Sequence, residues 1–163
     1  MGDRHTKKRD PIERSNRSPA NPGHGCAGFG LDDTTPEYLL RALVDRVPDY
    51  LFVKDTQSRF VVANPAVATD LGHSAKDLIG KTDFDLHPRK LAEKFFADEQ
   101  EVIRSGESKI DVDEFVVTTS GQKKWLSTSK LPLRNPGGEV IGIVGVCRDI
   151  TERKHAEAAL IES

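Results

Sequence analysis

The sequence contains little cysteine and no long apolar run. Cysteine occurs only at Cys26 and Cys147, without the spacing of a disulfide framework or a metal site. Both are therefore expected to be reduced thiols. No apolar run approaches the roughly 20 residues of a membrane span, and the N-terminus is charged where a signal peptide would be apolar. These absences predict a soluble, cytoplasmic chain.

A strong charge of one sign is also absent. The 163 residues include 24 Lys and Arg against 26 Asp and Glu, for a net charge of −2. Residues 1–30 hold six basic and three acidic residues, which leaves 18 against 23 in the remainder. A mildly acidic body argues against nucleic acid as the main partner. The short basic run at 4–9 is expected to be a solvated terminus.

Motifs for catalysis and metal binding are missing as well. The sequence shows no nucleophile beside a base, no glycine-rich phosphate loop and no paired carboxylates on one face. The histidines have no partners at metal-ligand spacing; they are His5, His24, His73, His87 and His155. We therefore expect no catalytic residue and no metal ligand in this chain.

The amino-acid composition of the sequence changes near residue 34. Residues 1–33 are rich in Pro, Gly, Ser, Asn and charge, which predicts a disordered leader. Thr35 then suits a helix N-cap and Pro36 the first helical position. An apolar stripe at helical spacing predicts a helix over 36–47; its members are Leu39, Leu40, Leu43, Val44 and Val47. The 36 % of apolar residues suffices for one domain.

Apolar residues at strand spacing predict a β-rich domain. The expected strands are 50–55, 59–64, 109–119, 123–134 and 139–149. Polar turns after Asp55, at Gly121 and at 135–138 indicate antiparallel neighbours. A slip of phase between Val112 and Phe115 predicts either a β-bulge in the third strand or an early end to its regular pairing.

Both faces of the last predicted strand are apolar. Val140, Val144 and Val146 point one way, and Ile141, Ile143 and Cys147 point the other way. The helices expected at 65–72, 74–80 and 88–105 can cover only one face of the sheet. The apolar stripe of the first helix, or a second copy of the protein, is left to cover the other face.

The last strand runs directly into a charged, alanine-rich helical pattern. Asp149 and Glu152 have the spacing of a capping box, and Thr151 offers an alternative cap. Ala156 and Leu160 then lie on a narrow seam suited to contact between two helices. A helix of roughly a dozen residues is marginal in water, so it is expected to need a partner helix or a longer chain. A frayed tail is the alternative.

Two long stretches read "DYLFVKDTQSRFVVANPAVATDLGHSAKDLIGKTDFDLHP" and "GQKKWLSTSKLPLRNPGGEVIGIVGVCRDITERK". They resemble the PAS domains of bacterial sensor histidine kinases and diguanylate cyclases, and the resemblance covers about residues 36–160. It implies an α+β fold with a five-stranded antiparallel sheet in the order 2-1-5-4-3 and a small pocket beneath short helices. The PAS domain is expected over 34–149, and the start of a coiled-coil signalling helix over 150–163.

Each cofactor known for PAS domains depends on a particular residue, whose presence can be checked in this sequence. Flavin-binding photosensors carry a cysteine just after the short helices, where this sequence reads "GKTDFDLHP". Haem-binding members carry a histidine well inside the long helix, where this sequence has Leu91, Phe95 and Phe96. Haem and a photoreactive flavin are therefore not expected, and the identity of any ligand stays open. His87 is expected to be hydrogen-bonded or exposed rather than a ligand, and Cys147 to be a small buried residue.

The resemblance also implies site residues. Expected pocket walls are Phe52, Val53, Leu91, Phe95, Leu126, Thr128 and Ile143, with simple core packing as the alternative. Signal transmission is implied at Asp149, Ile150, Thr151 and Glu152. A dimer interface is implied at Leu39, Leu40, Leu43, Val44, Ala156 and Leu160.

The function implied by the resemblance is that of a sensory and dimerisation module in two-component signal transduction. A ligand or partner signal would pass through the C-terminal helix to an effector such as a histidine kinase. Because the sequence has no kinase motif and no "GGDEF" signature, the effector would be another domain of the chain or a partner protein. The alternative is a module for protein association, with a closed core and no ligand.

Overall fold

The computed structural model describes residues 34–118 and 120–163, so the predicted disordered leader at 1–33 lies outside the described residues. The chain divides into two units, Met1–Thr34 and Thr35–Ser163, and the described helices and strands belong to the second. In chain order these are α1 (Pro36–Arg46), β1 (Tyr50–Asp55), β2 (Phe60–Ala63), α2 (Pro65–Asp70), α3 (Ala75–Leu78), the 3-10 helix η1 (Asp83–Asp85), α4 (Arg89–Ser105), β3 (Lys109–Val117), β4 (Lys123–Arg134), β5 (Val140–Asp149) and α5 (Thr151–Glu162).

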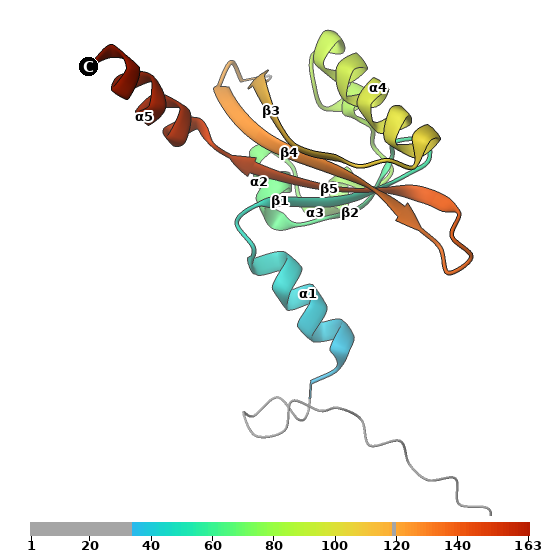
Figure 1. The fold of residues 1–163 in the computed structure, drawn as a ribbon. Coiled ribbons are helices and arrows are strands. Elements are labelled where there is room, and N and C mark those ends of the chain that lie inside the picture. Colours follow the sequence, from blue (N-terminus) through green and yellow to red (C-terminus); the bar gives the residue numbers. More distant parts are fainter. Residues whose placement is uncertain (1–33, 119) are drawn as a thin grey trace, which may run out of the picture. The chain divides into compact units, whose positions relative to one another are not determined.

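The strands form one antiparallel sheet in the order β2-β1-β5-β4-β3 (Figure 1). β5 is central, with Val146 opposite Leu51 on β1 and Cys147 opposite Thr128 on β4. The predicted α+β class and the predicted strand order are therefore confirmed. Within the described part of the chain, no helix is both long and apolar enough to cross a membrane.

Local signals in the sequence set the ends of several helices. The Thr35 side chain accepts a hydrogen bond from the N–H of Tyr38, and the Asn64 side chain accepts one from Val67, as expected of N-caps. Gly106 ends α4 with a φ of 68°, in the left-handed region that glycine adopts without steric cost. The helix boundaries therefore follow from the capping residues that the sequence shows.

The bulge in β3 lies earlier than the phase slip predicted. The pairing of β3 with β4 shifts register between Lys109 and Val112, whereas the sequence placed the slip between Val112 and Phe115. The physical reason is Asp111, which has a φ of 50° and donates its N–H to Ser129 Oγ at 3.0 Å. That left-handed residue absorbs the extra position, and regular pairing resumes at Val112.

The hydrophobic core lies on one face of the sheet. Phe52, Ile143 and Cys147 from the strands cluster with Leu78 of α3 and Val102 of α4. Burial of these side chains from both layers holds the helices against the sheet. The core thus sits between this face and the segment from α2 to α4.

The opposite face of the sheet is only partly covered. Leu51 and Val53 of β1 and Val144 of β5 remain partly exposed. The expectation that the first helix covers this face is not met by the chain itself, because α1 has no buried residue, and Leu40 and Leu43 are 63 % and 62 % exposed. Contacts within the described chain therefore leave two apolar surfaces at least partly exposed, namely this face of the sheet and the stripe on α1.

We predict that Gly145→Ala lowers the free energy of unfolding by about 1–3 kcal/mol, because a methyl group there would overlap the ring of Phe52 in the packed core. Urea denaturation measures the change. The matched control is Gly137→Ala in the turn before β5, where the added carbon would meet only Asn135 Oδ1, at 3.3 Å. Equal stability of the two variants would contradict this account of the core.

Candidate ligand-binding cavity and its link to the C-terminal helix

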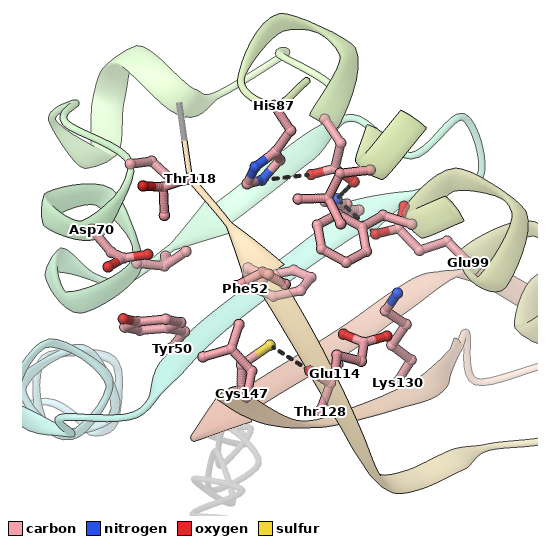
Figure 2. Close-up of a pocket in the computed structure, with 18 of the residues that line it drawn as sticks. Tyr50, Phe52, Asp70, His87, Glu99, Glu114, Thr118, Thr128, Lys130 and Cys147 are labelled. Atoms are coloured by element: carbon pink, nitrogen blue, oxygen red, sulfur yellow. Dashed lines mark hydrogen bonds and ion pairs between the residues drawn. The ribbon is translucent and has the colours of Figure 1, made fainter. Parts of the chain in front are cut away.

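A cavity of about 70 Å³ lies between the sheet and the helices (Figure 2). By the same measure a water molecule needs about 10–15 Å³, so the space suits several waters or one small molecule. Its apolar lining is Phe52, Phe60, Val67, Leu71, Leu91, Phe95, Val116, Val117, Leu126 and Cys147. Its polar lining is Tyr50, Lys54, Asp70, Asp83, His87, Glu99, Glu114, Thr118, Thr128 and Lys130. An apolar enclosure with a few convergent polar groups is typical of a small-molecule site.

One wall of the cavity is a buried ion triad. Lys54 Nζ lies 2.6 Å from Asp83 Oδ2 and 2.7 Å from Glu99 Oε1, and the Lys54 side chain is 1 % exposed. The three residues come from β1, η1 and α4. Burial disfavours the charge on Lys54, but the two carboxylates outweigh it and raise its pKa. Burial also raises the pKa of Glu99, although Lys54 opposes that rise.

A second buried cation is Lys124, on the face of β4 that points toward the cavity. Its ammonium group pairs with the Asp70 carboxylate and lies 3.2 Å from Tyr50 Oη. Burial opposes its charge, but the hydrogen bonds to Asp70 and Tyr50 raise its pKa. Burial likewise raises the pKa of Tyr50 to about 12, so both groups keep their protons at neutral pH.

Lys130, further along β4, differs from these two lysines. It is 4 % exposed, and its Nζ has no hydrogen-bond partner among the described residues. Its ammonium group lies 5.0 Å from the centre of the Phe95 ring, which gives a cation–π contact. Glu99 Oε2 is a buried atom that also lacks a hydrogen-bond partner within the described chain.

His87 and Cys147, which were considered above in relation to cofactors, are packed against neighbouring side chains. Burial lowers the pKa of His87, whose Nε2 is 3.8 Å from Asp83 Oδ1 and whose ring stacks edge-on against Phe95. Burial raises the pKa of the Cys147 thiol to about 11, and Thr128 donates to its Sγ. In the described ranges, no three His, Cys, Asp or Glu side chains are placed to hold a metal ion.

The structure brings most of the expected wall residues together. Phe52, Leu91, Phe95, Leu126 and Thr128 all line the cavity. Val53 and Ile143 do not. Val53 belongs to the opposite face of β1, because strand neighbours alternate, and Ile143 is a fully buried core residue beside the cavity.

Sequence reasoning missed the buried charges. Lys54 stands two positions after Phe52 and so shares its inward face, and Lys124 and Lys130 share the inward face of β4 with Thr128. Those spacings were a usable signal, because a lysine on the core face of a strand must find a partner. The partners themselves lie far away in the sequence.

The start of α5 is fastened to the sheet next to the cavity. The N–H of Ile150 donates to the carbonyl of Trp125 at 2.9 Å, and the N–H of Trp125 donates to Thr151 Oγ1 at 3.0 Å. The adjacent residue on β4, Leu126, lines the cavity and pairs in register with Asp149. Cavity wall and helix start therefore share one short segment of β4.

The predicted capping box at this junction is not formed. The N-cap of α5 is Ile150, which makes no side-chain capping bond. Asp149 Oδ1 instead accepts from the N–H and the hydroxyl of Thr151, at 2.9 and 2.6 Å. The reason is that Asp149 still belongs to β5, so its carboxylate reaches the first helical residue and not the third.

Beyond its first turn, α5 leaves the sheet. Lys154 binds Asp113 of β3 at 2.7 Å and lies 5.1 Å from the centre of the Trp125 ring. The helix then continues outward from the end of β5 (Figure 1). Leu160 is 75 % exposed, and α5 has no buried residue.

Residues 44–155 match the family described as the PAS fold. The chain therefore belongs to that family and contains a PAS domain. It is 31 % identical over 126 residues to the methanogenesis regulatory histidine kinase FilI of Methanothrix harundinacea, which covers 77 % of this chain and 14 % of FilI. It is 33 % identical over 124 residues to a diguanylate cyclase of Vibrio cholerae, which covers 75 % of this chain and 38 % of the cyclase.

A similar solved structure is that of VqmA bound to DPO. It matches with a TM-score of 0.64 and 30 % identity, over 73 % of this chain and 59 % of that one. The chain thus spans well under half the length of these two curated relatives and somewhat more than half of VqmA. The histidine kinase and cyclase relatives therefore each contain much that this chain does not match.

We predict that Lys54→Met lowers the free energy of unfolding by about 3–5 kcal/mol, because Asp83 and Glu99 would be left buried beside an apolar group. Guanidinium denaturation measures the loss. Arg89→Met is the matched control, since Arg89 pairs with Glu93 on the exposed side of α4 and such a pair contributes little. If Lys54→Met were as stable as that control, the triad would not hold the fold together.

Proposed function

We propose that this chain is the sensory module of a signal-transduction protein. A small molecule occupies the cavity, and its presence is passed through α5 to an effector such as a histidine kinase or a diguanylate cyclase. The observation that carries the proposal is the shared segment of β4, in which Leu126 lines the cavity and Trp125 holds the start of α5. The kinase and cyclase relatives support an effector of this kind.

The signal requires two arrangements of the β4–α5 junction. A ligand shifts such an equilibrium only by its difference in affinity for the two arrangements. Leu126 is positioned to sense the ligand, because its side chain faces the cavity while its register partner Asp149 binds Thr151. A small movement of β4 therefore changes where the first turn of α5 is anchored. We propose that 34–149 is the sensory domain and 150–163 the start of a coiled-coil linker.

We also propose that the chain functions as a homodimer. The surface left open includes the exposed Leu40 and Leu43 on α1 and Leu160 on α5. An isolated helix of about 12 residues is marginal in water, so α5 gains stability from pairing with a second α5. The proposed interface comprises Leu39, Leu40, Leu43, Val44, Ala156 and Leu160.

The second candidate is a module for association only. The partly open apolar face of the sheet and the exposed stripe of α1 favour it, because both would serve a partner whether or not the cavity is filled. The two candidates differ in whether the cavity holds a ligand. Native mass spectrometry of the purified chain decides between them: a dimer with an added small mass supports sensing, and a dimer without one supports association.

We predict that Thr151→Val loosens the junction without unfolding the domain. The variant removes the hydroxyl that binds both Trp125 and Asp149. Because each of these two hydrogen bonds contributes about 1 kcal/mol, the backbone amides of the first two turns of α5 should exchange about 5- to 30-fold faster with deuterium. His155→Gln, an exposed change in the second turn of α5, is the control and should leave the exchange unaltered. Unchanged exchange in Thr151→Val would rule out this junction as the link.

A further inference from the structure

Two buried polar atoms on the cavity lining have no hydrogen-bond partner within the described residues. They are Lys130 Nζ and Glu99 Oε2, on side chains that are 4 % and 1 % exposed. Buried polar groups in folded proteins are nearly always paired, and an unpaired buried charge is costly. Figure 2 shows both side chains on the same side of the labelled Phe52, Lys130 from the sheet and Glu99 from the helix. Both residues line the same cavity of about 70 Å³, so an occupant of that cavity lies beside both.

Comparison with the other inward-facing lysines shows that Lys130 is set apart. Lys54 is held by Asp83 and Glu99, and Lys124 by Asp70. Lys130 lies over the face of the Phe95 ring and attracts Glu99 electrostatically, but its ammonium group has no hydrogen-bond partner among the described residues. The same fold thus provides carboxylate partners for two buried ammonium groups and leaves a third with its donors free, within the part of the chain that the structure describes.

A second hollow of about 270 Å³ adjoins this end of the cavity. It lies between α4 and β3 and is bounded by Lys94, Asp98, Lys109 and Val112. It shares Glu114, Thr128 and Lys130 with the cavity. Lys130 therefore lies where the two hollows adjoin.

The charges around Lys130 favour a neutral occupant. The two hollows are lined by four lysines and five carboxylates, and Lys124, which pairs with Asp70, brings the charges level. The lysines are Lys54, Lys94, Lys109 and Lys130, and the carboxylates are Asp70, Asp83, Asp98, Glu99 and Glu114. Glu114 is paired at 3.8 Å with Lys94, and Glu99 with Lys54. An added ion would upset this balance in a poorly solvated space, whereas a neutral molecule would not.

We propose that the cavity binds a small neutral molecule in which a carbonyl or similar acceptor, paired with Lys130, stands close to an N–H or O–H that donates to Glu99. Small amides, lactams and hydroxyketones combine these groups on a compact apolar body. The aromatic and aliphatic lining, with Phe52, Phe95 and Leu126, contacts that body. This inference rests on the proposed sensory function and specifies its ligand.

The probe for this class is 2-pyridone, which presents a ring N–H beside a carbonyl. The control is N-methyl-2-pyridone, which keeps the acceptor and the ring but lacks the donor. We expect 2-pyridone to shift amide resonances of cavity residues in NMR titrations and to bind at least about 10-fold more tightly than the control, because a hydrogen bond to a charged group is lost with the methyl group. Equal binding of the two, or no binding of 2-pyridone, would overturn the assignment of the ligand class.

Lys130→Met, with Lys124→Met as the matched control, separates recognition from structure. Lys130→Met should weaken 2-pyridone binding about 10-fold or more, because the donor to the carbonyl is lost, and it should melt at the same or a higher temperature, because it replaces an unpaired buried charge. Lys124→Met should melt several degrees lower, since Asp70 loses its cation. If Lys130→Met melted as low as Lys124→Met, Lys130 would be a structural residue and the proposal would be wrong.

Two experimental outcomes distinguish a failure of the proposed ligand class from a failure of the proposed sensory function. If native mass spectrometry finds a bound molecule of another chemical class, sensing stands and the ligand class is wrong. If 2-pyridone binds as expected but deuterium exchange in α5 is the same with and without it, the ligand class stands and the transmission through α5 is wrong.

Discussion

The ammonium group of Lys54, buried between the carboxylates of Asp83 and Glu99, is the interaction on which the rest of the site depends. Removing these charges from water costs several kcal/mol per ion, which only close pairing can offset. Since the three residues come from β1, η1 and α4, the pairing fixes the position of both helical segments over the sheet. The same three residues line the cavity, so the triad that joins the two layers also forms one of its walls.

The parts of this fold that the sequence predicted are those decided by local chemistry. Strand spacing located β1, β4 and β5 to within a residue, and side-chain caps such as Asn64 located helix starts. The apolar residues on both faces of β5 indicated a central strand, which the pairing confirms. The order of all five strands needed the resemblance to PAS domains, because antiparallel hairpins alone do not say that β5 returns between β1 and β4.

The site was predicted less completely, because its polar half is made by contacts distant in sequence. Lys54 lies 29 residues from Asp83 and 45 from Glu99, so neither partner could be read from spacing. The apolar wall was easier, since Phe52 and Phe95 follow strand and helix periods. The capping box failed for a related reason: Asp149 had the right spacing, but its pairing with Leu126 keeps it in β5. Local spacing shows which roles are open to a residue such as Asp149, a helix cap or a strand residue. Its contacts with distant parts of the chain decide which role it takes.

β4 connects the cavity with the start of α5. Its inward face places Leu126, Thr128 and Lys130 on the cavity, and the adjacent Trp125 anchors α5. Stability alone would favour an apolar residue in place of Lys130, because a buried ammonium group without a carboxylate partner opposes folding. A molecule that pairs with Lys130 removes that cost only while it is bound. Under the function proposed above, the folded domain is more stable when the cavity is occupied, and that difference acts on β4, which binds the start of α5.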